Sequence, residues 1–178
     1  MNTSKPNFII AGVMKGSTSA AAVNLNKHED IYCVTGYWKS KVNTYYSIDP
    51  STMSGGLSET VSKELDFFNI EANYNLGIDF YKQYFPRPNK IQGEASPNYF
   101  AANETSNEVV TRMHTHLPDA KIIIILRDPI TRAYSHFNMI QSKNPSWGSR
   151  FYGISFNSAT EQKPLNNNIL QRSTYLSN

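Results

Sequence analysis

The sequence of 178 residues contains very little cysteine and no long apolar run. Cys33 is its single cysteine, so no disulfide can form within the chain, and we expect it to be a small core residue. No apolar stretch approaches the roughly 20 residues of a membrane-spanning helix, and the N-terminus lacks the apolar segment of a signal peptide. We therefore expect a soluble, cytoplasmic protein with no membrane segment.

The chain also has little excess of charge of either sign. The chain has 17 Lys and Arg against 14 Asp and Glu, a net charge of +3, and no basic run. This mild excess suits an anionic ligand and does not indicate a nucleic-acid partner. His114 and His116 have too few partners nearby in the sequence to indicate a metal site. The length predicts a single domain, residues 1–178, with a sizeable core.

Apolar runs of strand length alternate with helical patterns along the chain. Strands are expected at 8–13, 31–34, 91–94 and 121–126, and helices at 18–25, 71–85, 103–117 and 129–143. The nearly unbroken isoleucine run at 121–126 is typical of a strand buried on both faces. This alternation predicts an α/β fold, a parallel sheet flanked by helices on both faces.

Three other stretches are less regular. Residues 35–62 and 144–165 are rich in small and polar residues and are expected to be loops; the first, an insertion, could be a lid over a site. Residues 63–69 alternate apolar and acidic side chains, which predicts a half-buried strand end. A short helix is expected after residue 166.

The first predicted strand leads into a turn that could bind an anion. Lys15 and Gly16 follow the apolar run, and Thr18 or Ser19 can begin the next helix. Backbone N–H groups and the positive end of the helix then point to one spot, which suits a phosphate or sulfate. The order differs from a Walker A loop, in which Lys follows the second Gly. An ordinary connection between a strand and a helix remains the alternative.

Charged residues end three of the predicted strands, namely Lys15, Glu94 and Arg127. Because ligands bind at the carboxyl ends of parallel strands, these residues mark a candidate site. A kinase would carry a magnesium-binding Asp where this chain has Arg127, which instead suits a second anionic group. Ser135 lies about two helical turns later and forms a stripe with Arg132 and Met139 at three- and four-residue spacing. Its hydroxyl could face the same anion as Arg127; an exposed helix serine is the alternative.

Four segments together resemble the sulfotransferases that use 3′-phosphoadenosine-5′-phosphosulfate (PAPS), especially heparan sulfate N- and 3-O-sulfotransferases and their bacterial relatives. They are residues 8–18, the KELDFFN segment at 63–69, the segments GIDFY and YFP that lead to GEASPNYF at 93–100, and ILRDP at 125–129 with RAYSH at 132–136. RSTY at 172–175 resembles a later stretch of the family. The resemblance covers most of the chain, in order.

The resemblance implies a P-loop-type sulfotransferase fold and assigns roles to individual residues. Lys15 with the amides of Gly16, Ser17, Thr18 and Ser19 would hold the 5′-phosphosulfate, and Lys15 would stabilise the leaving phosphate oxygen. Arg127 and Ser135 would hold the 3′-phosphate. Glu64 aligns with the general base; a solvated acid is its alternative. No metal is implied, and the acceptor would be a hydroxyl or amine, expected on a saccharide.

The chain departs from the family pattern in several places. Ser17 stands where a second glycine is usual, Ala95 stands where the animal enzymes carry Lys, and the stretch between Val34 and Lys63 is longer than in those enzymes. Family members usually continue beyond Tyr175, so a fragment or a minimal form is expected. A P-loop nucleotide kinase and a non-catalytic protein that binds PAPS or its product remain the alternative functions.

Overall fold

The computed structural model describes residues 4–34, 36–39, 44–47, 64–101, 106–142 and 155–161. Internal contacts divide the chain into two compact units. Residues 1–13 and 17–125 belong to the first unit, and residues 14–16 and 126–178 belong to the second.

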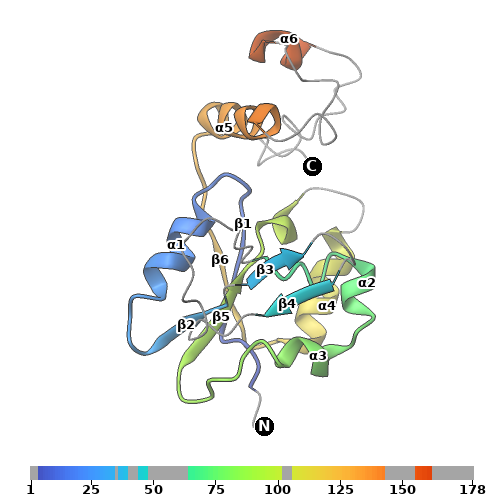
Figure 1. Cartoon of the computed structure of the whole chain (residues 1–178). Coiled ribbons are helices and arrows are strands. Elements are labelled where there is room, and N and C mark those ends of the chain that lie inside the picture. The colour runs from blue at the N-terminus through green and yellow to red at the C-terminus, as the bar shows by residue number, and fades with distance from the viewer. Residues whose placement is uncertain are drawn as a thin grey trace. The chain divides into compact units, whose positions relative to one another are not determined.

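A parallel sheet forms the centre of the first unit (Figure 1). Its strands are β1 (Phe8–Gly12), β2 (Ile31–Cys33), β5 (Ile91–Ala95) and β6 (Lys121–Ile124). Their order is β2-β5-β1-β6, and all three pairings are parallel. The predicted α/β fold with a parallel sheet is confirmed.

Helices cover both faces of this sheet (Figure 1). They are α1 (Thr18–Leu25), α2 (Glu71–Tyr74), α3 (Ile78–Lys82), the short 3-10 helix η2 (Pro97–Phe100) and α4 (Ser106–His116). Alternate residues of β1 divide between two cores: Phe8 and Ile10 pack in a cluster with Ala22 of α1, and Ile9 packs in a cluster with Tyr81 of α3. This division follows from the two-residue period of a strand. Cys33 is fully buried in the α1 cluster, as expected.

The predicted helix at 71–85 is two helices, so that prediction was wrong in extent. α2 ends at Tyr74 and α3 begins at Ile78, with Gly77 between them at φ 83°. This left-handed backbone cannot continue a right-handed helix, and glycine adopts it without a steric penalty.

β6 is a strand as predicted, but it is not buried. Ile122 is 50% exposed, and Ile123 and Ile124 are also exposed. Among the described strands β6 pairs with β1 alone, so it lies at an edge of the sheet. An apolar run indicates a strand that can be buried on both faces, but its position in the sheet depends on the other strands.

The expected loop at 35–62 contains two paired strands. β3 (Gly36–Lys39) and β4 (Thr44–Ser47) form an antiparallel pair in which Tyr37 is opposite Tyr46 and Trp38 is opposite Tyr45. Aromatic residues favour strands, which the small polar residues around them concealed in the sequence pattern. The rest of this stretch lies outside the described residues.

The second unit contains α5 (Pro129–Ser142) and α6 (Phe156–Glu161). Asp128 caps α5: its Oδ1 accepts the N–H of Thr131 at 2.9 Å, and Pro129 occupies the first position of the helix. α6 lies within the expected loop at 144–165, which is a correction. Phe137 of α5 and Phe156 of α6 pack edge to face, 5.4 Å between ring centroids, and this tertiary contact supports a helix too short to be stable alone.

The short helix expected after residue 166 and the RSTY segment at 172–175 lie outside the described residues. Within the parts of the chain that the structure describes, no helix combines the length and the apolar character needed to cross a membrane.

Gly93 supplies a test of the sheet. A Cβ at this position of β5 would overlap the ring of Phe8 on β1. We expect Gly93→Ala to lower the free energy of unfolding by about 1–3 kcal/mol, measured by urea denaturation, because the core must shift to admit the methyl group. In the Phe8→Leu background the same substitution should cost less than in the wild type. Equal losses in both backgrounds would contradict this account.

Candidate functional site

The second unit contains a pocket of about 790 Å³ at the start of α5. It brings together three residues that the sequence predicted to bind anions, namely Lys15, Arg127 and Ser135. Lys15 and Ser135 are half-buried, and Arg127 is exposed. The other lining residues are Ile130, Thr131, Tyr134, Asn138 and Met139.

Two arginines hold the turn that carries Lys15. Arg127 donates from Nη1 to the carbonyl oxygen of Lys15 at 3.3 Å, and Arg132 donates from Nη1 to the carbonyl oxygen of Met14 at 3.1 Å. Arg132 is fully buried. Hydrogen bonds from a charged donor are stronger than neutral ones, so these contacts hold the turn against the start of α5 and the residues just before it.

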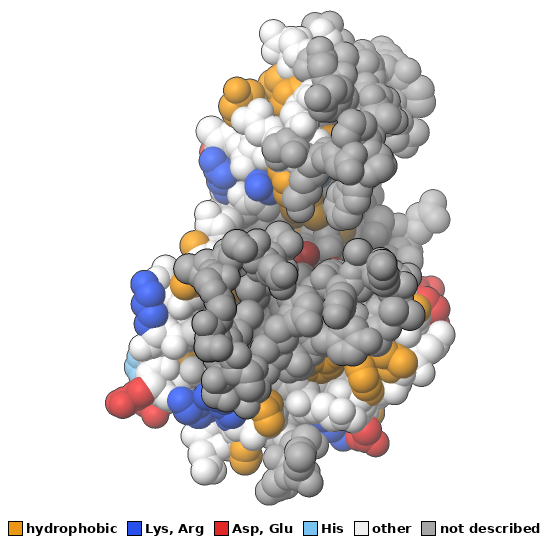
Figure 2. Space-filling view, in the orientation of Figure 1, with side chains coloured by type: hydrophobic (Ala, Val, Ile, Leu, Met, Phe, Trp, Pro, Cys, Tyr) orange, Lys and Arg blue, Asp and Glu red, His pale blue; other side chains and the backbone are white. Residues whose placement is uncertain are grey.

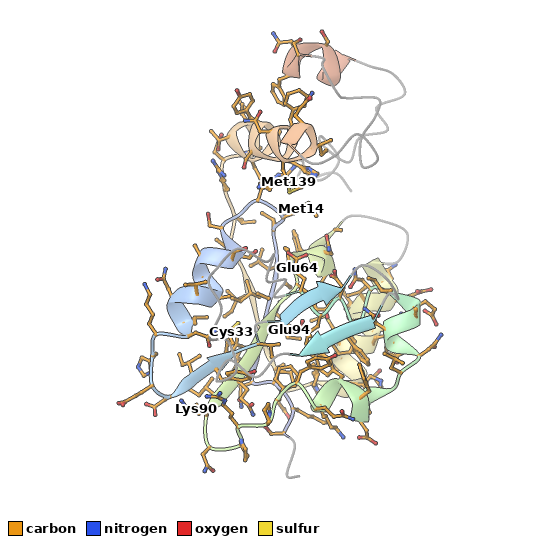
Figure 3. The ribbon with its side chains drawn as sticks, viewed as in Figure 1. Met14, Cys33, Glu64, Lys90, Glu94 and Met139 are labelled. Carbon is orange, nitrogen blue, oxygen red and sulfur yellow. The ribbon has the colours of Figure 1, made fainter. Side chains whose placement is uncertain are left out.

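The residues of the stripe on α5 lie in two different environments. Ser135 and Met139 line the pocket, but Arg132 does not; its side chain is buried and contacts the turn (Figure 3 labels Met14 and Met139). The pocket instead receives Thr131, Tyr134 and Asn138, which the sequence analysis missed. The spacing 131, 135, 138 places residues on one helical face and could have revealed them, but several faces of α5 carry polar side chains.

The charge of the pocket suits an anion. Lys15 and Arg127 both contribute a cation, and none of the described lining residues is acidic. The hydroxyls of Thr131, Tyr134 and Ser135 and the amide of Asn138 add hydrogen-bonding groups. Figure 2 shows basic side chains exposed beside hydrophobic ones on the part of the chain that carries α5. This set of side chains can bind a phosphate or sulfate group through both charge and hydrogen bonds.

The turn between β1 and α1 adopts an uncommon backbone. Lys15 has φ 66° and Ser17 has φ 73°, both in the left-handed region. Ser17 is the N-cap of α1, and its side chain makes no cap hydrogen bond. Thr18 is buried and Ser19 is exposed. The backbone N–H groups and the positive end of a helix are the kind of groups that bind an anion, and this turn leads directly into the start of α1.

Glu64 lies in the first unit, on the segment that precedes α2. The predicted strand at 63–69 is wrong for the residues the structure describes: Glu64 to Asp66 have no regular structure and a turn follows. Asp66 has φ 46°, and the N–H groups of Asp66 and Phe67 donate to side chains instead of a neighbouring strand. Glu64 is half-buried, whereas Leu65, Asp66 and Phe67 are buried.

Glu94 is the residue before the end of β5, and its side chain is fully buried. Its carboxyl group accepts hydrogen bonds from Tyr81, Ser96 and Tyr99. Burial raises the pKa of Glu94 to about 7, and these three hydroxyl donors oppose the rise while the nearby Asp66 adds to it. The sequence placed Glu94 among the charged strand ends, but it could not indicate that this carboxyl is enclosed by hydroxyl groups.

A metal site is not evident in the described parts of the chain. Across residues 4–34, 64–101, 106–142 and the shorter described stretches, no three His, Cys, Asp or Glu side chains are grouped where they could hold a metal ion.

Comparison with known proteins links these features to one family. A sequence profile described as "Sulfotransferase family" matches residues 6–172. Bifunctional heparan sulfate N-deacetylase/N-sulfotransferase 3 of Homo sapiens is 31% identical over 171 residues, 94% of this chain and 17% of that protein. Heparan sulfate glucosamine 3-O-sulfotransferase 5 of Homo sapiens is 31% identical over 137 residues, 76% of this chain and 31% of that protein. The chain therefore spans a third or less of the length of these relatives.

A solved structure shares the fold. The crystal structure of a sulfotransferase from Alicyclobacillus acidocaldarius has a TM-score of 0.59 to this chain and 25% sequence identity. The similarity covers 96% of this chain and 64% of the other.

The left-handed backbone of Ser17 leads to a prediction. We expect Ser17→Gly to raise the free energy of unfolding by about 0.5–1 kcal/mol, because glycine avoids the steric penalty of this conformation and that gain exceeds its greater entropy loss. Ser19→Gly is the matched control: it lies inside α1 and should lower the same quantity by about 0.5 kcal/mol. Urea denaturation without ligand measures both. A loss of stability in both variants would contradict the role of the Ser17 backbone.

Proposed function

Because the chain belongs to the sulfotransferase family, we propose that it transfers the sulfuryl group of PAPS to a hydroxyl or amine of an acceptor, with a saccharide as the acceptor class. PAPS carries a phosphosulfate at its 5′ position and a phosphate at its 3′ position. A protein that binds it needs cationic and hydrogen-bonding groups for both.

The observation that carries the proposal is the pocket lined by Lys15, Arg127 and Ser135. Lys15 is more than a hundred positions from Arg127 and Ser135 in the sequence, and the fold of the second unit brings the three residues together. An arginine where a magnesium-binding Asp would stand in a kinase favours binding of an anion over binding of a metal. The pocket therefore supports the proposal that the ligand is a nucleotide with a 3′-phosphate in addition to its 5′ group.

Each residue has a proposed role. Arg127 and Ser135 bind the 3′-phosphate. Lys15, with the backbone amides of Gly16, Ser17, Thr18 and Ser19, binds the 5′-phosphosulfate. When bound, PAPS supplies an activated sulfuryl group, and Lys15 stabilises the negative charge that develops on the leaving phosphate oxygen.

Glu64 is proposed as the general base. It takes the proton from the acceptor hydroxyl or amine as the new bond to sulfur forms. Its half-buried position on an irregular segment is compatible with contact with a substrate. Lys15 and Glu64 thus act at opposite ends of the transfer, one on the leaving group and one on the acceptor.

The acceptor class rests on the relatives. Their names specify heparan sulfate as the substrate, one with transfer to nitrogen and one with transfer to the 3-oxygen of glucosamine. A transfer assay with labelled PAPS should therefore include N-deacetylated heparan sulfate, N-sulfated heparan sulfate, a simple phenol and an alkylamine. We expect label on one of the polysaccharides. Binding of adenosine 3′,5′-bisphosphate with no transfer to any acceptor would indicate a non-catalytic binding protein.

Arg127→Ala tests the second anion site. It removes charge-assisted hydrogen bonds worth about 1.5–3 kcal/mol each, so the affinity for adenosine 3′,5′-bisphosphate should fall by roughly 10- to 100-fold or more. Affinity for adenosine 5′-monophosphate should change little, because that ligand lacks the 3′-phosphate. Lys90→Ala removes the same charge from a residue that does not line the pocket and should leave both affinities unchanged. Calorimetry measures both affinities. An equal loss of affinity for the two ligands in Arg127→Ala would indicate a structural role for the arginine.

Glu64→Gln tests the general base. The amide keeps the shape of the side chain but cannot accept a proton, so turnover should fall by about 10²–10⁴-fold. The affinity for adenosine 3′,5′-bisphosphate should stay at the wild-type value. Glu29→Gln changes an exposed acid of the first unit and is the charge-matched control for the rate. Wild-type turnover in Glu64→Gln would exclude this carboxylate as the base.

A further inference from the structure

We propose that Glu94 is a positioning residue for Glu64: it orients two buried hydroxyl groups that bind the backbone of the segment carrying Glu64. This inference rests on the proposed function, because it concerns the residue assigned there as the base. Figure 3 labels both residues, Glu94 on β5 and Glu64 above it in this view.

Two hydrogen-bonded chains connect Glu94 to the segment. Ser96 donates from Oγ to Glu94 Oε2 at 2.7 Å and accepts the N–H of Asp66 at 3.1 Å. Tyr99 donates from its hydroxyl to Glu94 Oε1 at 3.0 Å and accepts the N–H of Phe67 at 2.9 Å. Asp66 and Phe67 are the second and third residues after Glu64, so each chain ends close to it in the sequence.

The carboxylate determines the direction of every bond in these chains. An ionised carboxyl group can only accept hydrogen bonds, so the hydroxyls of Ser96 and Tyr99 must turn their hydrogens toward Glu94. Their lone pairs are then available to the two backbone N–H groups. If the carboxylate were replaced by an amide, its NH₂ group would face a hydroxyl, and that hydroxyl would lose the acceptor for its own hydrogen.

The segment depends on these side chains because no strand pairs with it in the described part of the chain. Asn73 donates from Nδ2 to the carbonyl oxygens of Leu65 and Asp66, at 3.1 and 3.3 Å. Asn98 donates from Nδ2 to both carboxylate oxygens of Asp66, at 3.2 Å each. Side chains therefore take the place of the backbone ladder that would hold a strand.

The groups around Glu94 stabilise its carboxyl group in the core. Tyr81 donates a third hydrogen bond, to Oε1 at 2.6 Å, and Tyr81 and Tyr99 are themselves buried hydroxyl groups whose pKa values burial raises. Asp66 is an acid close enough to raise the pKa of Glu94 further. A buried charge is tolerated when hydrogen bonds surround it. Because the pKa of Glu94 is raised to about 7, experiments at pH 8 examine mainly its ionised form.

Amide hydrogen exchange measured by NMR tests the contacts without any substrate. In Glu94→Gln at pH 8, we expect faster exchange at the amides of Asp66 and Phe67 than global stability explains. Gln92→Met is the control for a general weakening of β5, since Gln92 is equally buried on the same strand and bonds to Ser4 and Arg87 instead. Unchanged protection of both amides in Glu94→Gln would overturn the proposal.

Two buried tyrosines give a matched pair that keeps the carboxylate. Both hydroxyls donate to Glu94 Oε1, but only that of Tyr99 also accepts an N–H from the segment. Tyr99→Phe should accelerate exchange at Phe67 and lower kcat more than Tyr81→Phe does. Equal effects of the two substitutions would mean that the cluster serves stability alone. This comparison decides the question even where Glu94→Gln fails to fold.

Turnover then tests whether the positioning acts through Glu64. With the acceptor that gives the highest rate in the panel, Glu94→Gln should lower kcat by about 10- to 100-fold, as expected for a displaced base. The Kd for adenosine 3′,5′-bisphosphate should remain within threefold of the wild type. In the Glu64→Gln background the same change should have little further effect, because the base is already absent. If Glu94→Gln lowered kcat by the same factor in the Glu64→Gln background, the proposal would be overturned.

The two proposals fail in different ways. A wild-type protein that neither binds adenosine 3′,5′-bisphosphate nor transfers sulfate would contradict the proposed function. An active wild type together with a Glu94→Gln variant of unchanged kcat would contradict the positioning role alone.

Discussion

The parallel pairing of β1 with β6 is the constraint on which the arrangement of the pocket residues Lys15 and Arg127 depends. Beyond the strand ends, Ile125 donates its N–H to the carbonyl oxygen of Gly12 at 2.8 Å, and Val13 donates to the carbonyl oxygen of Ile125 at 3.2 Å. The chain therefore leaves both strands at the same edge of the sheet. Met14 to Gly16 follow one strand and Arg127 follows the other, so residues more than a hundred positions apart enter the second unit together.

Arginine side chains continue this pairing where the strands have ended. The hydrogen bonds from Arg127 and Arg132 to the carbonyl oxygens of Lys15 and Met14 take over from the backbone ladder. Arg132 is fully buried while Arg127 is exposed in the pocket. Arg132 thus holds the turn from a buried position, and Arg127 contacts the turn while its side chain stays exposed in the pocket.

Side chains also take the place of backbone hydrogen bonds in the segment that follows Glu64. The segment after it has no partner strand among the described strands, and its amides bind Ser96 and Tyr99. A segment held in this way can adopt the left-handed backbone of Asp66, which a strand could not. Ala95, which stands where the animal enzymes carry Lys, lies in an apolar environment. Because side chains alternate along β5, Glu94 lies among the hydroxyl groups and Ala95 packs in the apolar cluster with Phe8 and Cys33.

The sequence alone was enough to determine the class of fold and the location of the turn. The strands at 8–12, 31–33, 91–95 and 121–124 and the cap at Asp128 follow from local patterns, because apolar periodicity and capping act over a few residues. Joint occurrence of several motifs in order indicated the family, which the comparisons confirmed. Lys15, Arg127 and Ser135 were named as anion-binding candidates from their places at strand ends and on a helix.

Tertiary structure decided what local patterns do not contain. The exposure of β6 depends on which strands lie beside it, and the burial of Arg132 depends on where the turn at Met14 lies. The irregular backbone after Glu64 depends on hydroxyl groups some 30 residues away in the chain. The enclosure of Glu94, with the pKa that it produces, likewise comes from Tyr81, Ser96 and Tyr99 meeting around one carboxyl group. These features arise from contacts between distant segments, and no window of the sequence that contains only one partner can specify them.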